Sequence, residues 1–127
     1  MDLIDYVIIV LKVIVSLSIL NVWLIQPKKS TKWRGGNAKT IIEEFKVYGL
    51  SKSFCYFIGF LKVSLALILL ASIQFEALAL TLIGSLGLAT LLVASVIMHL
   101  KVKDALYKSF PAFLFIIINL TIVFLTI

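Results

Sequence analysis

Four polar side chains stand out because they interrupt or end long apolar stretches: Lys12, Lys62, His99 and Asn119. A lysine charge inside a bilayer is costly, so such groups usually face protein or water and mark a functional position. Asparagine can donate and accept hydrogen bonds between helices, and histidine carries protons and binds metals near neutral pH. These four residues are therefore the candidate intramembrane polar site.

Two interpretations of Lys62 stay open. It shares a helical face with Cys55, Gly59 and Ala66, and this small, weakly polar stripe favours contact with another helix. Under that interpretation Asn119, which we place at a similar depth, is its candidate neighbour. The alternative is that Lys62 extends its apolar stem and places its ammonium among the headgroups.

For Lys12 we favour the headgroup interpretation, with the ammonium reaching out toward Asp5 or Glu76. His99 is the only histidine, and we interpret it as a structural side chain where the third apolar stretch ends. The chain has a single cysteine, which forms no internal disulfide and no cysteine-based metal site.

The sequence contains no arrangement of residues that matches a known catalytic template. Paired carboxylates, a nucleophile with its base, a phosphate-binding loop and metal-ligand spacing are all missing. It therefore predicts no catalytic residue, no metal and no bound cofactor, and it favours a protein that is not an enzyme.

The composition indicates which solvent surrounds these residues. Hydrophobic residues make up 62% of the 127 residues and charged residues 14%, against about 45–50% and about 25% in soluble domains. A soluble domain of this size could not bury so much apolar surface. The net charge of +6 lies between apolar blocks, so it favours the anionic surface of a bilayer rather than nucleic acid as the partner.

Four apolar blocks, at about residues 6–25, 54–75, 77–98 and 109–127, are each long enough to cross a bilayer once. Only helices satisfy their own backbone in lipid over such lengths. The sequence thus predicts an all-α fold: an integral membrane bundle of four transmembrane helices in one domain, residues 1–127.

Charge asymmetry predicts the orientation. Ten cations lie in the two loops at residues 26–53 and 101–108, whereas the opposite side carries only Asp2, Asp5 and Glu76. The positive-inside rule then places these loops in the cytoplasm and both termini outside, in a multi-pass protein of the cell's inner (plasma) membrane. Within the first loop we expect a short amphipathic helix at residues 38–48, capped by Asn37 and ended by Gly49.

Small residues on the second and third predicted helices favour close helix packing, either within the bundle or against a partner. The predicted packing positions are Gly59, Ala66, Gly84 and Gly87.

Three segments together resemble the DoxX-like membrane proteins: WRGGNAKTIIEEFKVYGL, FIGFLKVSLALILLA and MHLKVKDALYKSFPAFLF. The resemblance covers about residues 20–120 and implies a four-helix membrane fold. That group includes small subunits assigned to thiosulfate:quinone oxidoreductase, and it is similar to eukaryotic cargo receptors and receptor-assembly chaperones. The family pattern highlights six positions: Gly49, Leu50, Gly59, Lys62, His99 and Asp104. Many relatives have glutamate where Lys62 stands and proline where Ser51 stands.

Two functions are consistent with these observations. The first is a non-enzymatic accessory subunit or assembly factor, whose partners are the lipid bilayer and other membrane subunits or further copies of the chain. The alternative, which rests on the resemblance, is a subunit of a membrane oxidoreductase that handles quinone or a sulfur compound. Quinone is expected as a cofactor only under this alternative.

Overall fold

The computed structural model describes all 127 residues, and every regular element in it is helical. The elements in chain order are α1 (Leu3–Leu20), η1 (Asn21–Ile25, a π-helix), α2 (Ile41–Val47), α3 (Lys52–Phe75), α4 (Leu78–Lys101), η2 (Leu106–Ser109, a 3₁₀-helix) and α5 (Phe110–Thr126). Four segments are long and apolar enough to span a membrane: Leu3–Ile25, Lys52–Phe75, Leu78–Lys101 and Leu106–Thr126. The predicted fold class, an all-α membrane bundle with four candidate spans, is confirmed.

Local sequence signals explain where the helices begin and end. Asp2 and Asp5 form a capping box at the start of α1, and the Ser51 hydroxyl accepts a hydrogen bond from the Phe54 amide at the start of α3. Glu76 ends α3 in a left-handed conformation at φ 50°. Pro111 lies in the first turn of α5, where its missing N–H is tolerated.

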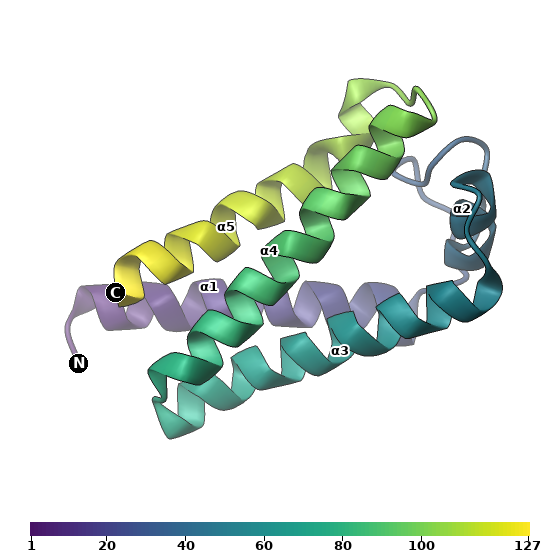
Figure 1. Cartoon of the computed structure of the whole chain (residues 1–127). Helices are drawn as coiled ribbons and strands as arrows, with labels where there is room; N and C mark the ends of the chain where they lie inside the picture. Colours follow the sequence, from purple (N-terminus) through teal and green to yellow (C-terminus); the bar gives the residue numbers. More distant parts are fainter.

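The four long helices form an open wedge rather than a parallel bundle (Figure 1). Helices α3 and α4 meet at the turn around Glu76 and diverge toward their other ends, and α2 lies at the open end between them. Both termini lie at the end of the Glu76 turn, which we name the termini end; the opposite end is the loop end. The core of the bundle consists of Val15, Ile19, Ala66, Leu69, Leu88, Leu92 and Ile122.

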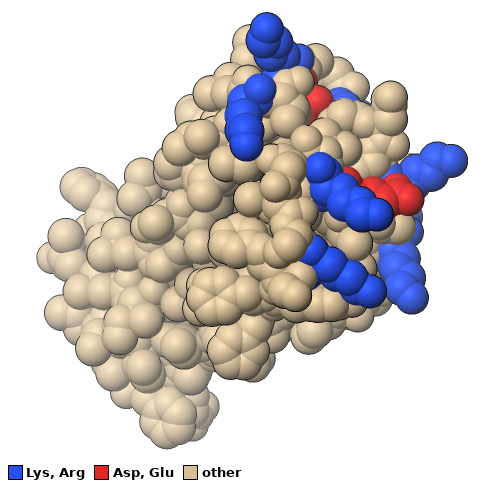
Figure 2. Space-filling model, turned by 45° about the vertical axis from the view of Figure 1, so that its right-hand side comes forward, with Lys and Arg blue, Asp and Glu red and all other residues tan.

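Charge is distributed unevenly along the molecule. Figure 2 shows Lys and Arg side chains gathered at the loop end, whereas the rest of the visible face carries none. Large apolar side chains are exposed on all four long helices, for example Leu17, Phe60, Ile83 and Phe124. An uncharged apolar surface of this extent is what contact with the hydrocarbon core of a bilayer requires.

The short loop helix is smaller than the predicted 38–48 segment. It covers Ile41–Val47, and its cap is Thr40, whose hydroxyl accepts from the Glu43 amide, rather than Asn37. The Ile41 amide donates to the Pro27 carbonyl at 2.9 Å. The chain before Ile41 is therefore held against the end of the first span and does not join the helix.

Three long helices extend beyond the predicted blocks. Helix α1 begins at Leu3 instead of residue 6, α3 begins at Lys52 instead of residue 54, and α4 continues to Lys101 instead of residue 98. His99 consequently belongs to the last turn of α4 and is buried there. Hydropathy underestimates these ends because the final helical turn at a membrane surface is commonly polar.

Candidate functional site

Lys62 lies between helices near the middle of α3, and the cavities beside it extend to the loop end. Its side chain is 7% exposed, and its Nζ donates to the Ser95 hydroxyl of α4 at 3.4 Å. The same ammonium lies 5.4 Å from the centre of the Trp23 ring, within the range of a cation–π interaction. Gly59, one turn earlier on α3, makes this approach possible, because a Cβ at Gly59 would lie 2.6 Å from the Trp23 ring.

The expected contact between Lys62 and Asn119 is absent, and that prediction was wrong. Asn119 is fully buried on α5, where its Nδ2 donates to the Phe115 carbonyl of the same helix at 2.8 Å. Its Oδ1 has no hydrogen-bond partner. The Lys62 ammonium is directed toward Trp23 and Ser95 instead.

A buried arginine from the first loop and a carboxylate from α2 line the same cavities as Lys62. Arg34 is 7% exposed, and its Nη2 donates to the carbonyls of Gln26, Pro27 and Lys29 at 3.2–3.4 Å. The Glu44 carboxylate of α2 accepts from the Gly35 amide at 2.6 Å. The sequence analysis did not single out Arg34 or Glu44. The one feature that could have indicated them is that both lie within the segment WRGGNAKTIIEEFKVYGL, which forms the first loop.

Two cavities adjoin Lys62, with volumes of about 200 and about 260 Å³. Trp23, Arg34, Glu44, Lys62 and Ser95 line both of them. We name these five residues the Lys62 site. It combines two buried cations, a carboxylate and an indole ring inside an apolar wall, which suits the recognition of a polar group that enters the bundle.

His99 fastens the loop to the end of α4. Its Nδ1 donates to Asp104 at 2.7 Å, and the other oxygen of that carboxylate accepts from the Gly36 amide at 2.9 Å. Lys108 lies 3.7 Å from Asp104 and donates to the Gly36 carbonyl at 2.7 Å. We name His99, Asp104, Lys108 and Gly36 the loop clasp, because they join α4, η2 and the first loop.

Electrostatics in the loop clasp favour an ionised Asp104. Burial acts to raise the pKa of this carboxyl, but the hydrogen bonds from His99 and Gly36 and the charge of Lys108 outweigh it, and the pKa is lowered. Burial also raises the pKa of Tyr48, assisted by the nearby carboxylates of Glu44 and Asp104, so the phenol stays neutral. The Tyr48 hydroxyl lies 3.5 Å from the His99 ring nitrogens.

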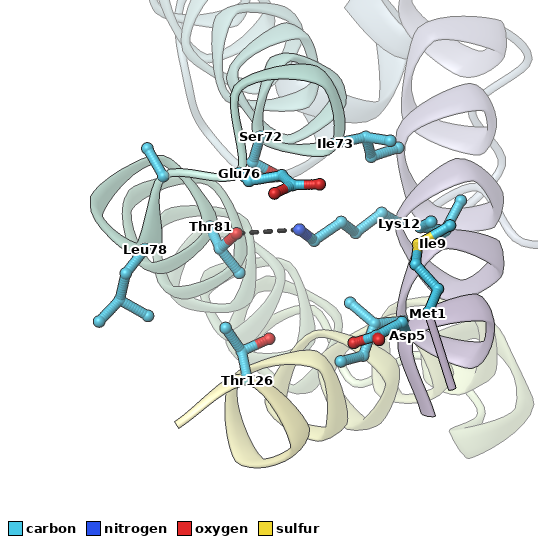
Figure 3. Close-up of a pocket in the computed structure, with 12 residues that line it drawn as sticks. Met1, Asp5, Ile9, Lys12, Ser72, Ile73, Glu76, Leu78, Thr81 and Thr126 are labelled. Carbon is cyan, nitrogen blue, oxygen red and sulfur yellow. Dashed lines mark hydrogen bonds between the residues drawn. The ribbon is translucent and has the colours of Figure 1, made fainter. Parts of the chain in front are cut away.

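Lys12 occupies a separate place at the termini end (Figure 3). Its side chain is 6% exposed, and its Nζ donates to the Thr81 hydroxyl of α4 at 2.9 Å. The expectation that it reaches out to Asp5 or Glu76 was wrong, since no carboxylate lies within 4.0 Å of the ammonium. Lys12 shares its helical face with the fully buried Val15 and Ser16, so its stem is directed into the bundle.

The four predicted polar residues therefore do not form one site. Lys62 and His99 line the same cavity of about 200 Å³ at the loop end, whereas Lys12 lines a cavity at the termini end. Asn119 lines neither of them. The glycines predicted for packing lie at helix contacts: a Cβ at Gly84 would lie 3.2 Å from the Leu69 backbone and one at Gly87 2.8 Å from Leu65.

Comparison with known proteins gives one match. The model of the DoxX-like family matches residues 33–121, a range that contains most of the Lys62 site and the whole loop clasp. Searches of the curated proteins and of the solved structures find no match.

Proposed function

This chain belongs to the DoxX-like family, and we propose that it is a non-enzymatic accessory subunit or assembly factor that receives a segment of a partner membrane protein beside Lys62. The observation that carries the proposal is the position of the Lys62 charge. It is buried, its only hydrogen bond is to a neutral hydroxyl at 3.4 Å, and no carboxylate lies within 4.0 Å. A partner with an acidic or polar intramembrane side chain would complete this arrangement.

Such a partner would reach Lys62 through the cavity of about 260 Å³. It is lined by residues of α3 and α4, including Ile58, Leu91, Ala94 and Met98. Ala94 is exposed on its rim, so a neighbouring helix could approach closely there. Arg34 and the α2 residues Ile41 and Phe45 line the same cavity from the loop end, so we propose that the partner enters between α3 and α4.

A photo-crosslinking amino acid at Ala94, introduced in the native membrane, tests this function. We expect a discrete adduct, and we expect Lys62→Leu to weaken it, because the partner's polar group then has no counterpart. The matched control places the same amino acid at Phe124, which is 78% exposed on α5. An adduct of twice the chain mass would identify the partner as a second copy. Equal labelling at both positions, unchanged by Lys62→Leu, would contradict the proposal.

A second candidate function is a subunit of a membrane oxidoreductase that handles quinone or a sulfur compound. The cavity of about 200 Å³ favours it, because Trp23 offers a planar surface and Lys62 and His99 offer polar atoms to a ring carbonyl. This function requires a stoichiometric quinone in the lipid extract of the purified protein, reduced in Trp23→Ala. An extract that lacks quinone would remove its support.

We further propose that the loop end faces the cytoplasm of a cell with the protein in its inner membrane, and that both termini lie outside. The basis is the concentration of cations at the loop end.

A further inference from the structure

A cavity of about 530 Å³ at the termini end is not used by the proposed function. It lies among α1, α3, α4 and the end of α5, and Lys12 extends across it from α1 to Thr81 (Figure 3). Its volume is within the usual range of small-ligand sites. Its lining joins apolar side chains such as Ile8 and Ile73 with polar ones.

The polar groups of Lys12 and Thr81 in this cavity have N–H and O–H donors that no acceptor uses. Lys12 has three N–H groups and uses one, to the Thr81 oxygen. The Thr81 hydroxyl accepts that bond, and its own hydrogen has no acceptor in the chain. Lys12 is more than nine-tenths buried and has no carboxylate within 4.0 Å. An ammonium in this state requires an acceptor group, preferably an anionic one.

The opening of the cavity carries the opposite charge. Asp5 on α1 and Glu76 at the end of α3 line it, both exposed, and Figure 3 shows them on either side of the Lys12 side chain. Lys12 is the only Lys or Arg in the termini half of the molecule. A ligand with an outer cation and an inner anion would pair with both the carboxylates and the buried ammonium.

We propose that this cavity binds the headgroup of a phosphatidylethanolamine lipid. The phosphate accepts from the free N–H groups of Lys12 and from the Thr81 hydroxyl. The primary ammonium of the same headgroup donates to Asp5 and Glu76. Ile8, Ile73 and Leu78 contact the glycerol and first methylene groups. Asp5 and Glu76 lie at the ends of the candidate spans Leu3–Ile25 and Lys52–Phe75, where headgroups are expected.

Other abundant lipid headgroups fit this charge pattern less well. Phosphatidylglycerol supplies the phosphate but brings no cation to Asp5 and Glu76, so its negative charge is repelled at the opening. Phosphatidylcholine carries a quaternary ammonium, which has no N–H to donate to a carboxylate. Of these three, the ethanolamine headgroup alone pairs with both ends of the cavity through hydrogen bonds to charged groups.

Native mass spectrometry of the delipidated protein, titrated separately with dioleoyl phosphatidylethanolamine, phosphatidylglycerol and phosphatidylcholine, tests the proposal. We expect the ethanolamine lipid to bind about tenfold more tightly than the other two, and Lys12→Met to remove about that factor. The double variant Asp5→Asn, Glu76→Gln should bind phosphatidylglycerol as well as phosphatidylethanolamine. Lys46→Met, the same change at an exposed lysine of α2, is the control and should bind like wild type.

Circular dichroism and size-exclusion chromatography establish that each variant is folded. If Lys12→Met does not fold, the double variant decides the question alone, because Asp5 and Glu76 are exposed and their substitution leaves the core intact. Binding of the three lipids with equal affinity in wild type would overturn the proposal. Soluble phosphoethanolamine that binds as tightly as the lipid would overturn the assignment to a lipid.

Discussion

The substitution Lys62→Leu separates the contribution of this charge to stability from its contribution to partner binding. In the isolated protein the substitution removes the hydrogen bond to Ser95, and such bonds inside membrane proteins average about 0.6 kcal/mol. It also removes the cation–π interaction with Trp23, which contributes on the order of 0.5–1 kcal/mol. The sum of the losses is about 1–1.5 kcal/mol.

The stability gained by removing the buried charge is larger than this loss. Insertion of a lysine at the centre of a membrane helix costs about 2.5–3.5 kcal/mol relative to an apolar residue. Removal of that cost should therefore leave Lys62→Leu about 1–2.5 kcal/mol more stable than wild type in detergent. Ser95→Ala is the matched control: it keeps the charge, loses the hydrogen bond, and should be about 0.6 kcal/mol less stable.

Partner binding should change in the opposite direction. When a polar side chain of the partner loses its counterpart in a buried interface, the binding free energy weakens by about 1–3 kcal/mol. Recovery of the partner should therefore fall about tenfold or more. Thermal unfolding in detergent and quantitative co-purification from native membranes measure the two effects. A Lys62→Leu protein that is less stable than wild type, or that recovers the partner fully, would refute the reasoning.

Three further predictions concern the loop clasp, the helix contacts and the orientation. Asp104→Asn should destabilise the protein by about 1–3 kcal/mol at pH 7, because an amide oxygen replaces a carboxylate that accepts from His99 and Gly36. Because the pKa of Asp104 is lowered on folding, its contribution to stability is complete above about pH 4 and is lost as the pH falls through the lowered pKa. Thermal unfolding of Asp104→Asn should therefore depend less on pH between about 5 and 3 than that of wild type. Equal pH dependence of the two proteins would contradict this prediction. Gly59→Ala should lower the free energy of unfolding by about 1–3 kcal/mol, because its Cβ would meet the Trp23 ring at 2.6 Å. The fluorescence of Trp23 should shift as well. Unchanged stability and fluorescence would show that the ring moves freely. Epitope tags at both termini should be accessible to a protease from outside intact cells, and protection of both tags would reverse the proposed orientation.

The sequence determined the solvent, the secondary structure and the number of spans. These properties depend on hydropathy and charge summed over about 20 consecutive residues, and neighbouring helices do not alter such sums. The resemblance to the DoxX-like family was also visible from short segments, and the family match over residues 33–121 confirms it. Capping residues such as Ser51 mark helix ends locally, although Asn37 shows that a plausible cap is not used where the loop is held elsewhere.

The tertiary structure decided which polar groups meet. The depth of Lys62 and Asn119 can be counted along each helix, but their contact depends on how each helix is rotated about its axis and how far α3 and α4 diverge. The same holds for Lys12, whose partner Thr81 lies 69 residues away in sequence and is reached because the long Lys12 side chain crosses the space between α1 and α4. The rotation of each helix and the divergence of α3 from α4 follow from the packing of whole helix surfaces. No single segment of the sequence specifies that packing.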